Sequence, residues 1–278
     1  MAMSHWLPVS ARHHLGGELA ALFQMGGPLI AAQLAQMATG FFDTVMMGRV
    51  GSTELAAVAI GTGLWHALFL LSLGILMGVS PSVAQCHGAG RTTMIAPLVR
   101  QALWLGMLLG IVCFVILRQM EGWLVWLGIE SAIVPVTGSY LRALSWGMPA
   151  IFLCMSLRLF SEGIGRTRPV FLVSVLGLVV NIVANYVLIF GHWGFPALGA
   201  LGCGIATALA MWVMLLGMLF LVRMDSAYHG YGLFQQWVWP RWQELRPLLI
   251  LGLPIGVSLF LESAIFATVA LLLGRLGA

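Results

Sequence analysis

The sequence has 278 residues, of which 60% are hydrophobic and 8% are charged, and its mean hydropathy is +0.99. A chain of this composition does not stay in solution, which excludes the soluble globular classes. The formal net charge of +4 is spread over loops, so it bears on membrane orientation rather than on nucleic-acid binding. We therefore predict an all-α polytopic membrane protein, with room for about six or seven spans of roughly 20 residues each.

The chain divides into a lead, six spans, a linker and a further span. Residues 1–20 form a polar cytoplasmic lead, and residues 21–223 hold six apolar stretches separated by Gly- and Pro-containing turns. Residues 224–246 form a polar linker that suits a membrane interface, and residues 247–278 hold the last span, with Pro247 at its mouth. We place the spans at about Leu22–Met47, Leu55–Ser80, Met94–Leu117, Leu141–Phe160, Val170–Phe190, Cys203–Val222 and Leu248–Leu273, with an interfacial connection at Arg118–Tyr140.

The basic residues predict how the chain is oriented. All 13 are Arg, and with the N-terminus inside, nine of them fall on the inner side and four on the outer side. The positive-inside rule therefore predicts a cytoplasmic N-terminus. The first apolar run is too long for a signal peptide, so we expect it to remain as a span. The four cysteines have no metal-like spacing and are expected to be reduced packing residues; they are Cys86, Cys113, Cys154 and Cys203.

The first span carries an acidic residue at membrane depth. Gln33, Gln36, Gly40 and Asp43 follow one another at i, i+3, i+7 and i+10, so they share one face of a helix that we expect to open at Pro28. A carboxylate in hydrocarbon is costly without a partner or water, which makes it a functional-site hypothesis. The alternative is an Asp that bonds a neighbouring helix for assembly alone.

The first and last spans carry Gly and Pro residues at equivalent positions. Moving the first span along by 226 residues (252 − 26) aligns Gly26 with Gly252 and Pro28 with Pro254, and the motif GRxG closes both spans. The two copies are six spans apart, so both begin on the same face of the membrane, as in a parallel internal repeat. We infer that the chain corresponds to the first half, plus one helix, of a transporter of about twelve spans.

Several stretches, taken in their order and spacing, carry a family resemblance. They are PLIAAQLAQMATGFFDTVMMGRVGSTELAAVAIG, YLRALSWGMPAIFLCMSLRLFSEGIGRTRP, NIVANYVLIFG, GHWGFPALGALGCGIATALA and LPIGVSLFLESAIFATVALLLG. The chain resembles the multidrug and toxic compound extrusion (MATE) family in its bacterial NorM-like branch. The resemblance implies a six-helix lobe that faces a second lobe across a central cavity. It also implies export of organic cations from the cytoplasm across the bacterial inner membrane, in exchange for inward Na⁺ or H⁺.

The resemblance also assigns a cation site. The family's acid in its first span matches Asp43, its Asn pair matches Asn181 and Asn185, and its Thr matches Thr207. With Gln36, these are the predicted cation-binding residues, and Asp43 and the two Asn are the candidate ligands of Na⁺. Because the two Asn are four residues apart, both amides leave one face of their helix. The alternatives are interhelical hydrogen bonds without an ion, and a Thr207 that bonds its own helix.

A second predicted group lies on the seventh span. The NorM-like acid of that span matches Glu262, which is grouped with Gln33, Phe260 and Phe266 for substrate binding and coupling. A buried carboxylate and aromatic faces both attract organic cations. The acid that the family carries in a later span of its second, C-terminal lobe has no counterpart in these residues, so that missing lobe is a predicted partner.

Three other functional classes compete with an exporter. A lipid or lipid-linked saccharide flippase is expected to place Arg in its cavity, whereas the centres of these spans carry acids. A membrane-embedded enzyme needs a nucleophile–base pair or a metal cluster at membrane depth, and no such pattern is visible, so we expect no enzymatic activity and no cofactor beyond the coupling ion. A non-transporting interaction subunit stays open, as do the choice between Na⁺ and H⁺ and the identity of the cargo.

Overall fold

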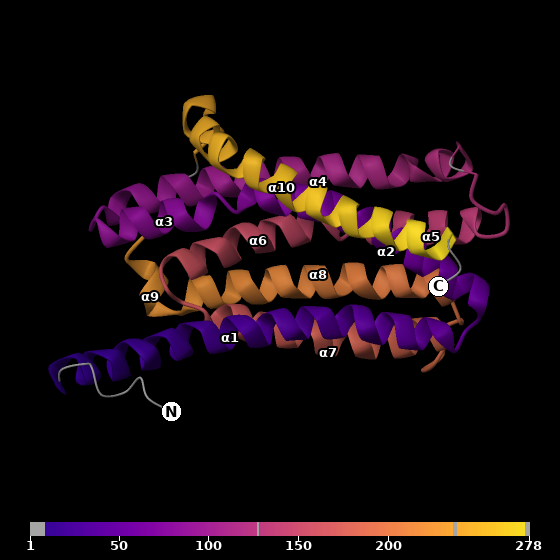
Figure 1. Ribbon diagram of the computed structural model, residues 1–278, viewed down its shortest axis with the longest axis horizontal. Helices are drawn as coiled ribbons and strands as arrows, with labels where there is room; N and C mark the ends of the chain where they lie inside the picture. The colour runs from indigo at the N-terminus through magenta and orange to yellow at the C-terminus, as the bar shows by residue number, and fades with distance from the viewer. Residues whose placement is uncertain (1–8, 127, 236–237, 276–278) are drawn as a thin grey trace.

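The computed structural model describes residues 9–126, 128–235 and 238–275, with side chains from residue 26 to residue 265 apart from Ala264. Every regular element in this described part is helical, which confirms the all-α prediction. Figure 1 shows the long helices lying roughly side by side. In chain order they are α1 (Val9–Gly48), α2 (Ser52–Leu76), α3 (Val79–Gly88), the 3-10 helix η1 (Thr92–Met94), α4 (Ile95–Trp126), α5 (Val134–Ser145), α6 (Met148–Gly163), α7 (Arg168–Phe190), α8 (Gly199–Met224), α9 (Ser226–His229) and α10 (Trp242–Arg275).

Most of the long helices can cross a membrane. Among the described residues, five stretches are long and apolar enough, and the bent pair α5–α6 makes a sixth. α1, whose side chains are described only from Gly26 onward, is not among them, but it lies along α7 in the same bundle (Figure 1). The predicted polytopic architecture is therefore confirmed. The five stretches are Ser52–Gly88, Thr92–Trp126, Arg168–Phe190, Gly199–Met224 and Trp242–Ser263.

Both predictions about proline-opened helices were wrong. α1 is helical from Val9, so Pro28 lies inside it and part of the predicted polar lead is helix. α10 begins at Trp242, ahead of Pro247. One proline removes a single backbone hydrogen bond, whereas unwinding several residues in hydrocarbon leaves several polar groups without partners. Continuing the helix through a proline is therefore the less costly choice.

The third and fourth predicted spans also differ from the structure. α4 continues to Trp126 and α5 begins at Val134, so the predicted connection Arg118–Tyr140 shrinks to residues 127–133. The fourth span is two helices, α5 and α6, bent by 48°. Pro149, in the first turn of α6, cannot donate the backbone hydrogen bond that would continue one straight helix across the junction.

Small residues bring the central helices into close contact. A Cβ atom on Gly202 of α8 would lie 2.6 Å from the backbone oxygen of Leu188 on α7. A Cβ atom on Gly106 of α4 would lie 2.8 Å from the backbone oxygen of Phe152 on α6. Helices in lipid associate through such close packing because no hydrophobic gain separates one helix from its lipid neighbours. The core therefore depends on glycines as much as on large buried side chains.

The described part of the predicted polar linker packs against the end of the bundle. We call its described residues, 225–235 and 238–241, the linker segment. Arg100 of α4 donates to the backbone oxygens of Gly232 (2.6 Å) and Leu233 (2.8 Å). Trp104 donates to the backbone oxygen of Val238 (2.9 Å) and stacks on Trp239. Trp237, within the predicted linker, lies outside the described residues.

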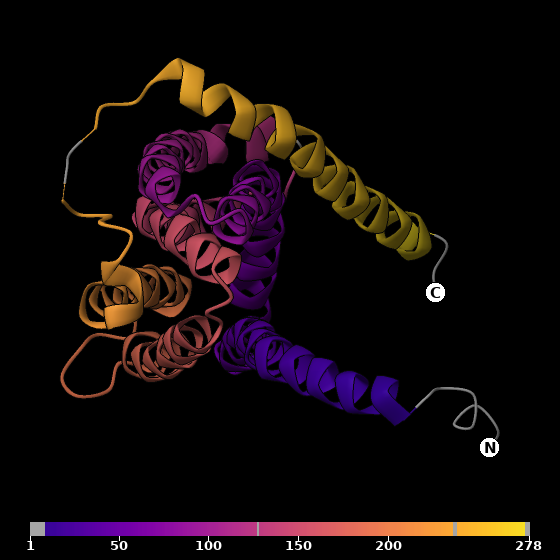
Figure 2. The same cartoon turned by 90° about the vertical axis from the view of Figure 1, so that its left-hand side faces the viewer.

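α10 packs on α2 through facing glycines and then leaves the bundle. A Cβ atom on Gly74 would overlap the backbone of Gly256, and one on Gly252 would overlap the backbone oxygen of Ile75. In Figure 2 the C-terminal part of α10 and the N-terminal part of α1 extend away from the bundle on the same side. α2 lies between them, and its Gly63 has open space where a Cβ atom would stand.

This contact predicts an unequal effect of two matched substitutions in the described helices. Gly252→Val should destabilise the chain by about 1–3 kcal/mol, because the new side chain overlaps the Ile75 backbone. Gly63→Val should change stability little, since it meets nothing. Thermal unfolding in detergent, followed by tryptophan fluorescence, compares them. Equal midpoints for the two variants would contradict close packing between α2 and α10.

Candidate functional site

α1 presents its acidic residue to the bundle near the end of the helix. Asp43 is buried, with 9% of its surface exposed, and Ala32, Ala35 and Met47 are buried with it. These four positions recur at helical spacing, so they form the side of α1 that packs on the bundle. Because α1 packs mainly on α7, that helix supplies the nearest partners for the carboxylate.

Two asparagines of α7 bind the carboxylate in series. Asn185 donates from Nδ2 to Oδ1 of Asp43 at 2.5 Å and also to Oδ1 of Asn181 at 3.0 Å. Both Asn side chains are fully buried, as the four-residue spacing on one helical face predicts. A buried carboxylate that accepts a short hydrogen bond avoids much of the cost of desolvation. The Asn pair therefore contacts Asp43 directly, as the sequence predicted.

α8 continues the series to a third helix. Asn181 donates to Oγ1 of Thr207 at 3.3 Å, and Thr207 donates to the backbone oxygen of Cys203 at 2.9 Å. Both suggested uses of Thr207, a contact within its own helix and a contact within the site, are thus present together. The polar series Asp43–Asn185–Asn181–Thr207 connects α1, α7 and α8 inside the bundle.

One oxygen atom in this series has no partner. Oδ1 of Asn185 is the only buried side-chain N or O atom, among the described residues, that lacks a hydrogen bond. The amide group that carries it bonds the Asp43 carboxylate and the Asn181 amide, and carboxylate and amide oxygens are ligands that hard cations take. A protonated Asp43 would equally provide the donor that this oxygen lacks. The donor set therefore fits either Na⁺ or H⁺.

A buried tyrosine borders the series, and sequence reasoning missed it. Tyr140 of α5 is 1% exposed, and its hydroxyl bonds Thr62 of α2 at 3.2 Å. Its ring fills the space that a Cβ atom on Gly61 would occupy, and it lies within electrostatic range of Asp43. The predicted interfacial connection Arg118–Tyr140 ends at this residue, so the prediction does not include Tyr140 in a span. No pattern in the sequence points to it, because its neighbours come from other helices.

The remaining predicted residues lie away from this series. Gln36 is half-buried, and because it precedes Asp43 by seven residues, it lies about 10 Å from Asp43 along the axis of α1, toward the N-terminus. Gln33 is exposed. Glu262 and Phe260 are exposed on α10, which packs on α2 and α4, and the side chain of Phe266 lies outside the described residues. The structure does not bring these residues to Asp43, and their functional roles stay predictions.

The direct contact between Asp43 and Asn185 predicts strong coupling in a double-mutant cycle. Asn185→Ala should cost about 1–3 kcal/mol, because it leaves the carboxylate without its donor. The same change in an Asp43→Asn background should cost at least about 0.5 kcal/mol less. Thr44→Val is the matched control, since the Thr44 hydroxyl bonds only its own helix at the backbone oxygen of Gly40 (2.8 Å). Additive effects of Asp43→Asn and Asn185→Ala on the thermal midpoint in detergent would contradict this contact.

The chain matches a known family over most of its length. The MatE family model matches residues 28–187. Multidrug resistance protein PmpM of Pseudomonas aeruginosa is 43% identical over 271 residues, which are 97% of this chain and 57% of that protein. The probable multidrug resistance protein NorM of Shewanella oneidensis is 40% identical over 265 residues, 95% of this chain and 58% of that protein. The chain thus spans little more than half the length of these relatives.

Solved structures show the same fold. The eukaryotic MATE transporter AtDTX14 superposes with a TM-score of 0.80 at 18% identity, over 92% of this chain and 56% of that one. An outward-facing multidrug resistance MATE transporter superposes with a TM-score of 0.77 at 22% identity, over 86% of this chain and 52% of that one. With the family match and the relatives, these findings show that the chain belongs to the MatE family, the multidrug and toxic compound extrusion transporters.

Proposed function

We propose that the chain forms part of a secondary active transporter that exports organic cations in exchange for inward Na⁺ or H⁺. The observation that carries this proposal is the buried series of Asp43, Asn185, Asn181 and Thr207, in which one amide oxygen has no partner. Such a site has two states, one with the carboxylate hydrogen-bonded to the amide and one with a cation or proton bound. Antiport requires that difference, because one ligand must change the affinity for the other.

The contact between α1 and α7 suggests how binding is transmitted. Asp43 and Asn185 belong to these two helices, which pack closely along each other. An ion that takes up the carboxylate oxygens weakens the hydrogen bond between the helices and changes how α1 packs. Pro28, inside α1, removes one backbone hydrogen bond and provides a place where the helix can bend. We propose that this change is linked to release of the cargo.

The residues that we propose to bind the exported cation lie mainly on α10. Glu262 is exposed there with Phe260, on a helix whose C-terminal part leaves the bundle (Figure 2). A carboxylate attracts a hydrophobic cation by its charge, and an aromatic ring does so by its face. Gln33 is exposed on α1, which diverges on the same side. We propose that residues of α1 and α10 border one cation-binding space.

The length of the relatives suggests what completes that space. The chain covers 57% of PmpM and 58% of NorM, and both carry the names of multidrug resistance proteins. We propose that residues 21–223 form one six-helix lobe, that residues 224–246 link the lobes, and that residues 247–278 are the first helix of a second lobe. In this proposal the protein lies in the bacterial inner membrane with its N-terminus in the cytoplasm, and transport needs both lobes.

Binding of a fluorescent organic cation tests the cargo site. The solubilised chain should bind such a dye, and Glu262→Gln should weaken binding about tenfold, which corresponds to about 1.4 kcal/mol of lost attraction. Glu130→Gln is the matched control, because it removes the same charge from an exposed position in the loop between α4 and α5. Equal affinities for the two variants would overturn the role of Glu262. Absence of dye binding would favour the alternative that the chain is a non-transporting interaction subunit.

Accessibility of α1 tests the coupling. A cysteine at Gln36, in a chain whose four native cysteines are replaced, should react with a maleimide at a rate that changes with Na⁺ or with pH when it is divided by the rate of a small free thiol under the same conditions. This division removes the general increase of thiol reactivity with pH, because the thiolate is the reacting form. Asp43→Asn should abolish that dependence, while the exposed Thr44→Val should preserve it. A dependence on Na⁺ at fixed pH would identify the coupling ion as Na⁺, and a dependence on pH alone would identify H⁺. Identical rates under all conditions would contradict the coupling proposal.

A further inference from the structure

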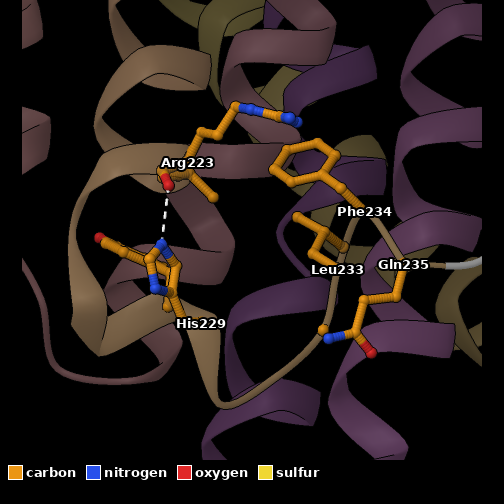
Figure 3. Close-up of a pocket in the computed structure, with 8 residues that line it drawn as sticks. Arg223, His229, Leu233, Phe234 and Gln235 are labelled. Atoms are coloured by element: carbon orange, nitrogen blue, oxygen red, sulfur yellow. Dashed lines mark hydrogen bonds between the residues drawn. The ribbon is translucent and has the colours of Figure 1, made fainter.

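A hollow of about 270 Å³ lies where α8 ends and the linker segment begins. Figure 3 shows the labelled side chains arranged around it, with His229 near the end of α8 and Phe234 and Gln235 on the linker segment. The lining combines charged, amide and aromatic groups in one place: Arg223, Tyr228, His229, Leu233, Phe234 and Gln235. The Asp43 series lies elsewhere in the bundle, so the cation site does not account for this hollow.

The walls of the hollow are held in place by the bundle. The hydroxyls of Tyr228 and Ser161 are hydrogen-bonded at 2.9 Å, and both residues are buried. Arg100 holds the backbone of Gly232 and Leu233. The lining is therefore formed before any ligand arrives, which lowers the entropic cost of binding.

Arg223 gives the lining of the hollow a positive charge, and the carboxylate of Asp225 lies close enough to act electrostatically on the neighbouring Tyr228. Among the described residues Arg223 has no ion-pair partner, and the side chain of the nearby Asp225 instead accepts a hydrogen bond from the backbone N–H of Ala227 at 2.9 Å. Burial raises the pKa of Tyr228, so the phenol stays neutral, and Arg166 is close enough to act electrostatically on it. An arginine left without a carboxylate suits a phosphate, which it can bind through two parallel hydrogen bonds.

Neutral donors add to this positive charge. His229 hydrogen-bonds through Nε2 to the backbone oxygen of Arg223 at 2.8 Å, and a carbonyl can only accept, so Nε2 carries a proton. Gln235 contributes a side-chain amide at the opposite side of the hollow (Figure 3). No acidic residue lines the hollow, so the groups around it favour an anion.

The surface of α8 beside the hollow is strongly apolar. Leu209, Leu216 and Phe220 are 47%, 60% and 62% exposed, and they precede Arg223 by fourteen, seven and three residues, which places all four on one face of α8. A lipid tail lying along these side chains would bring its headgroup to the end of the helix. Basic residues at helix ends are placed to contact headgroups in this way.

We propose that this hollow binds the phosphate headgroup of an anionic phospholipid, with Arg223 as the charged contact and an acyl chain along Leu216 and Phe220. The site is separate from cation exchange, and its occupation ties the linker segment to the lipid around α8. An anionic phospholipid, rather than free phosphate, is favoured because the charged and apolar surfaces are continuous.

Native mass spectrometry of the whole chain in detergent tests the proposal with two lipids of identical acyl chains. Phosphatidylglycerol should be retained several times more than phosphatidylcholine. Arg223→Gln should lower its retention about fivefold, the effect expected of one arginine near an anionic headgroup. Arg91→Gln is the charge-matched control, since Arg91 is exposed outside the hollow, and it should change retention little. Arg223→Lys should retain most of the binding.

The outcomes separate the lipid from other sources of phosphate. Phe220→Ser should weaken retention of long-chain phosphatidylglycerol but not of its six-carbon analogue, and because Phe220 is exposed this variant tests the site even if Arg223→Gln does not fold. Displacement of the lipid by inorganic phosphate at equal concentration would overturn the assignment to a phospholipid. Equal losses for Arg223→Gln and Arg91→Gln, or equal retention of the two lipids, would overturn the site itself. Neither readout depends on cation binding.

Discussion

A carboxylate at membrane depth has to be stabilised by neighbouring helices, and this requirement organises the centre of the molecule. Asp43 receives the Nδ2 donor of Asn185, and the same amide binds Asn181, which reaches Thr207 on a third helix. The helices that carry these side chains must keep one register, since a shift of one residue on α7 would turn both amides away from α1. The polar series thus fixes how α1, α7 and α8 lie together, and it places the only unpaired buried oxygen of the described side chains at their junction.

Close contacts between backbones also hold the described helices together. Glycines lie where α2 meets α10, where α4 meets α6 and where α7 meets α8, and each allows one backbone to approach another. Such contacts have little chemical specificity and tolerate no added volume. The two kinds of contact have different effects: the glycines allow dense packing in lipid, and the amide series fixes the register of the helices that carry it.

The class of protein and most of its membrane-spanning helices could be predicted from the sequence because they depend on local properties, and the family resemblance pointed to the acidic residue and its Asn neighbours. Apolar length predicts spans, and four-residue spacing places Asn181 and Asn185 on one face. Tyr140 could not be found, because its proximity to Asp43 arises from the packing of helices that are distant in sequence. The helix starts that we predicted from Pro28 and Pro247 were wrong for a different reason. Rules for helix ends are derived in water, whereas in lipid an unwound backbone is more costly than one missing hydrogen bond.

The linker segment has a mechanical consequence. Three side chains of α4 hydrogen-bond to its backbone: Arg100, Gln101 and Trp104. The linker segment is therefore fixed to the bundle and is not a flexible connection between α8 and α10. Any rotation of α10 must then pivot within the helix itself. Pro247 and Pro254 interrupt its hydrogen bonding on either side of Gly252, where it crosses α2. The position of α10 is therefore set by its fixed base and by the glycine crossing with α2.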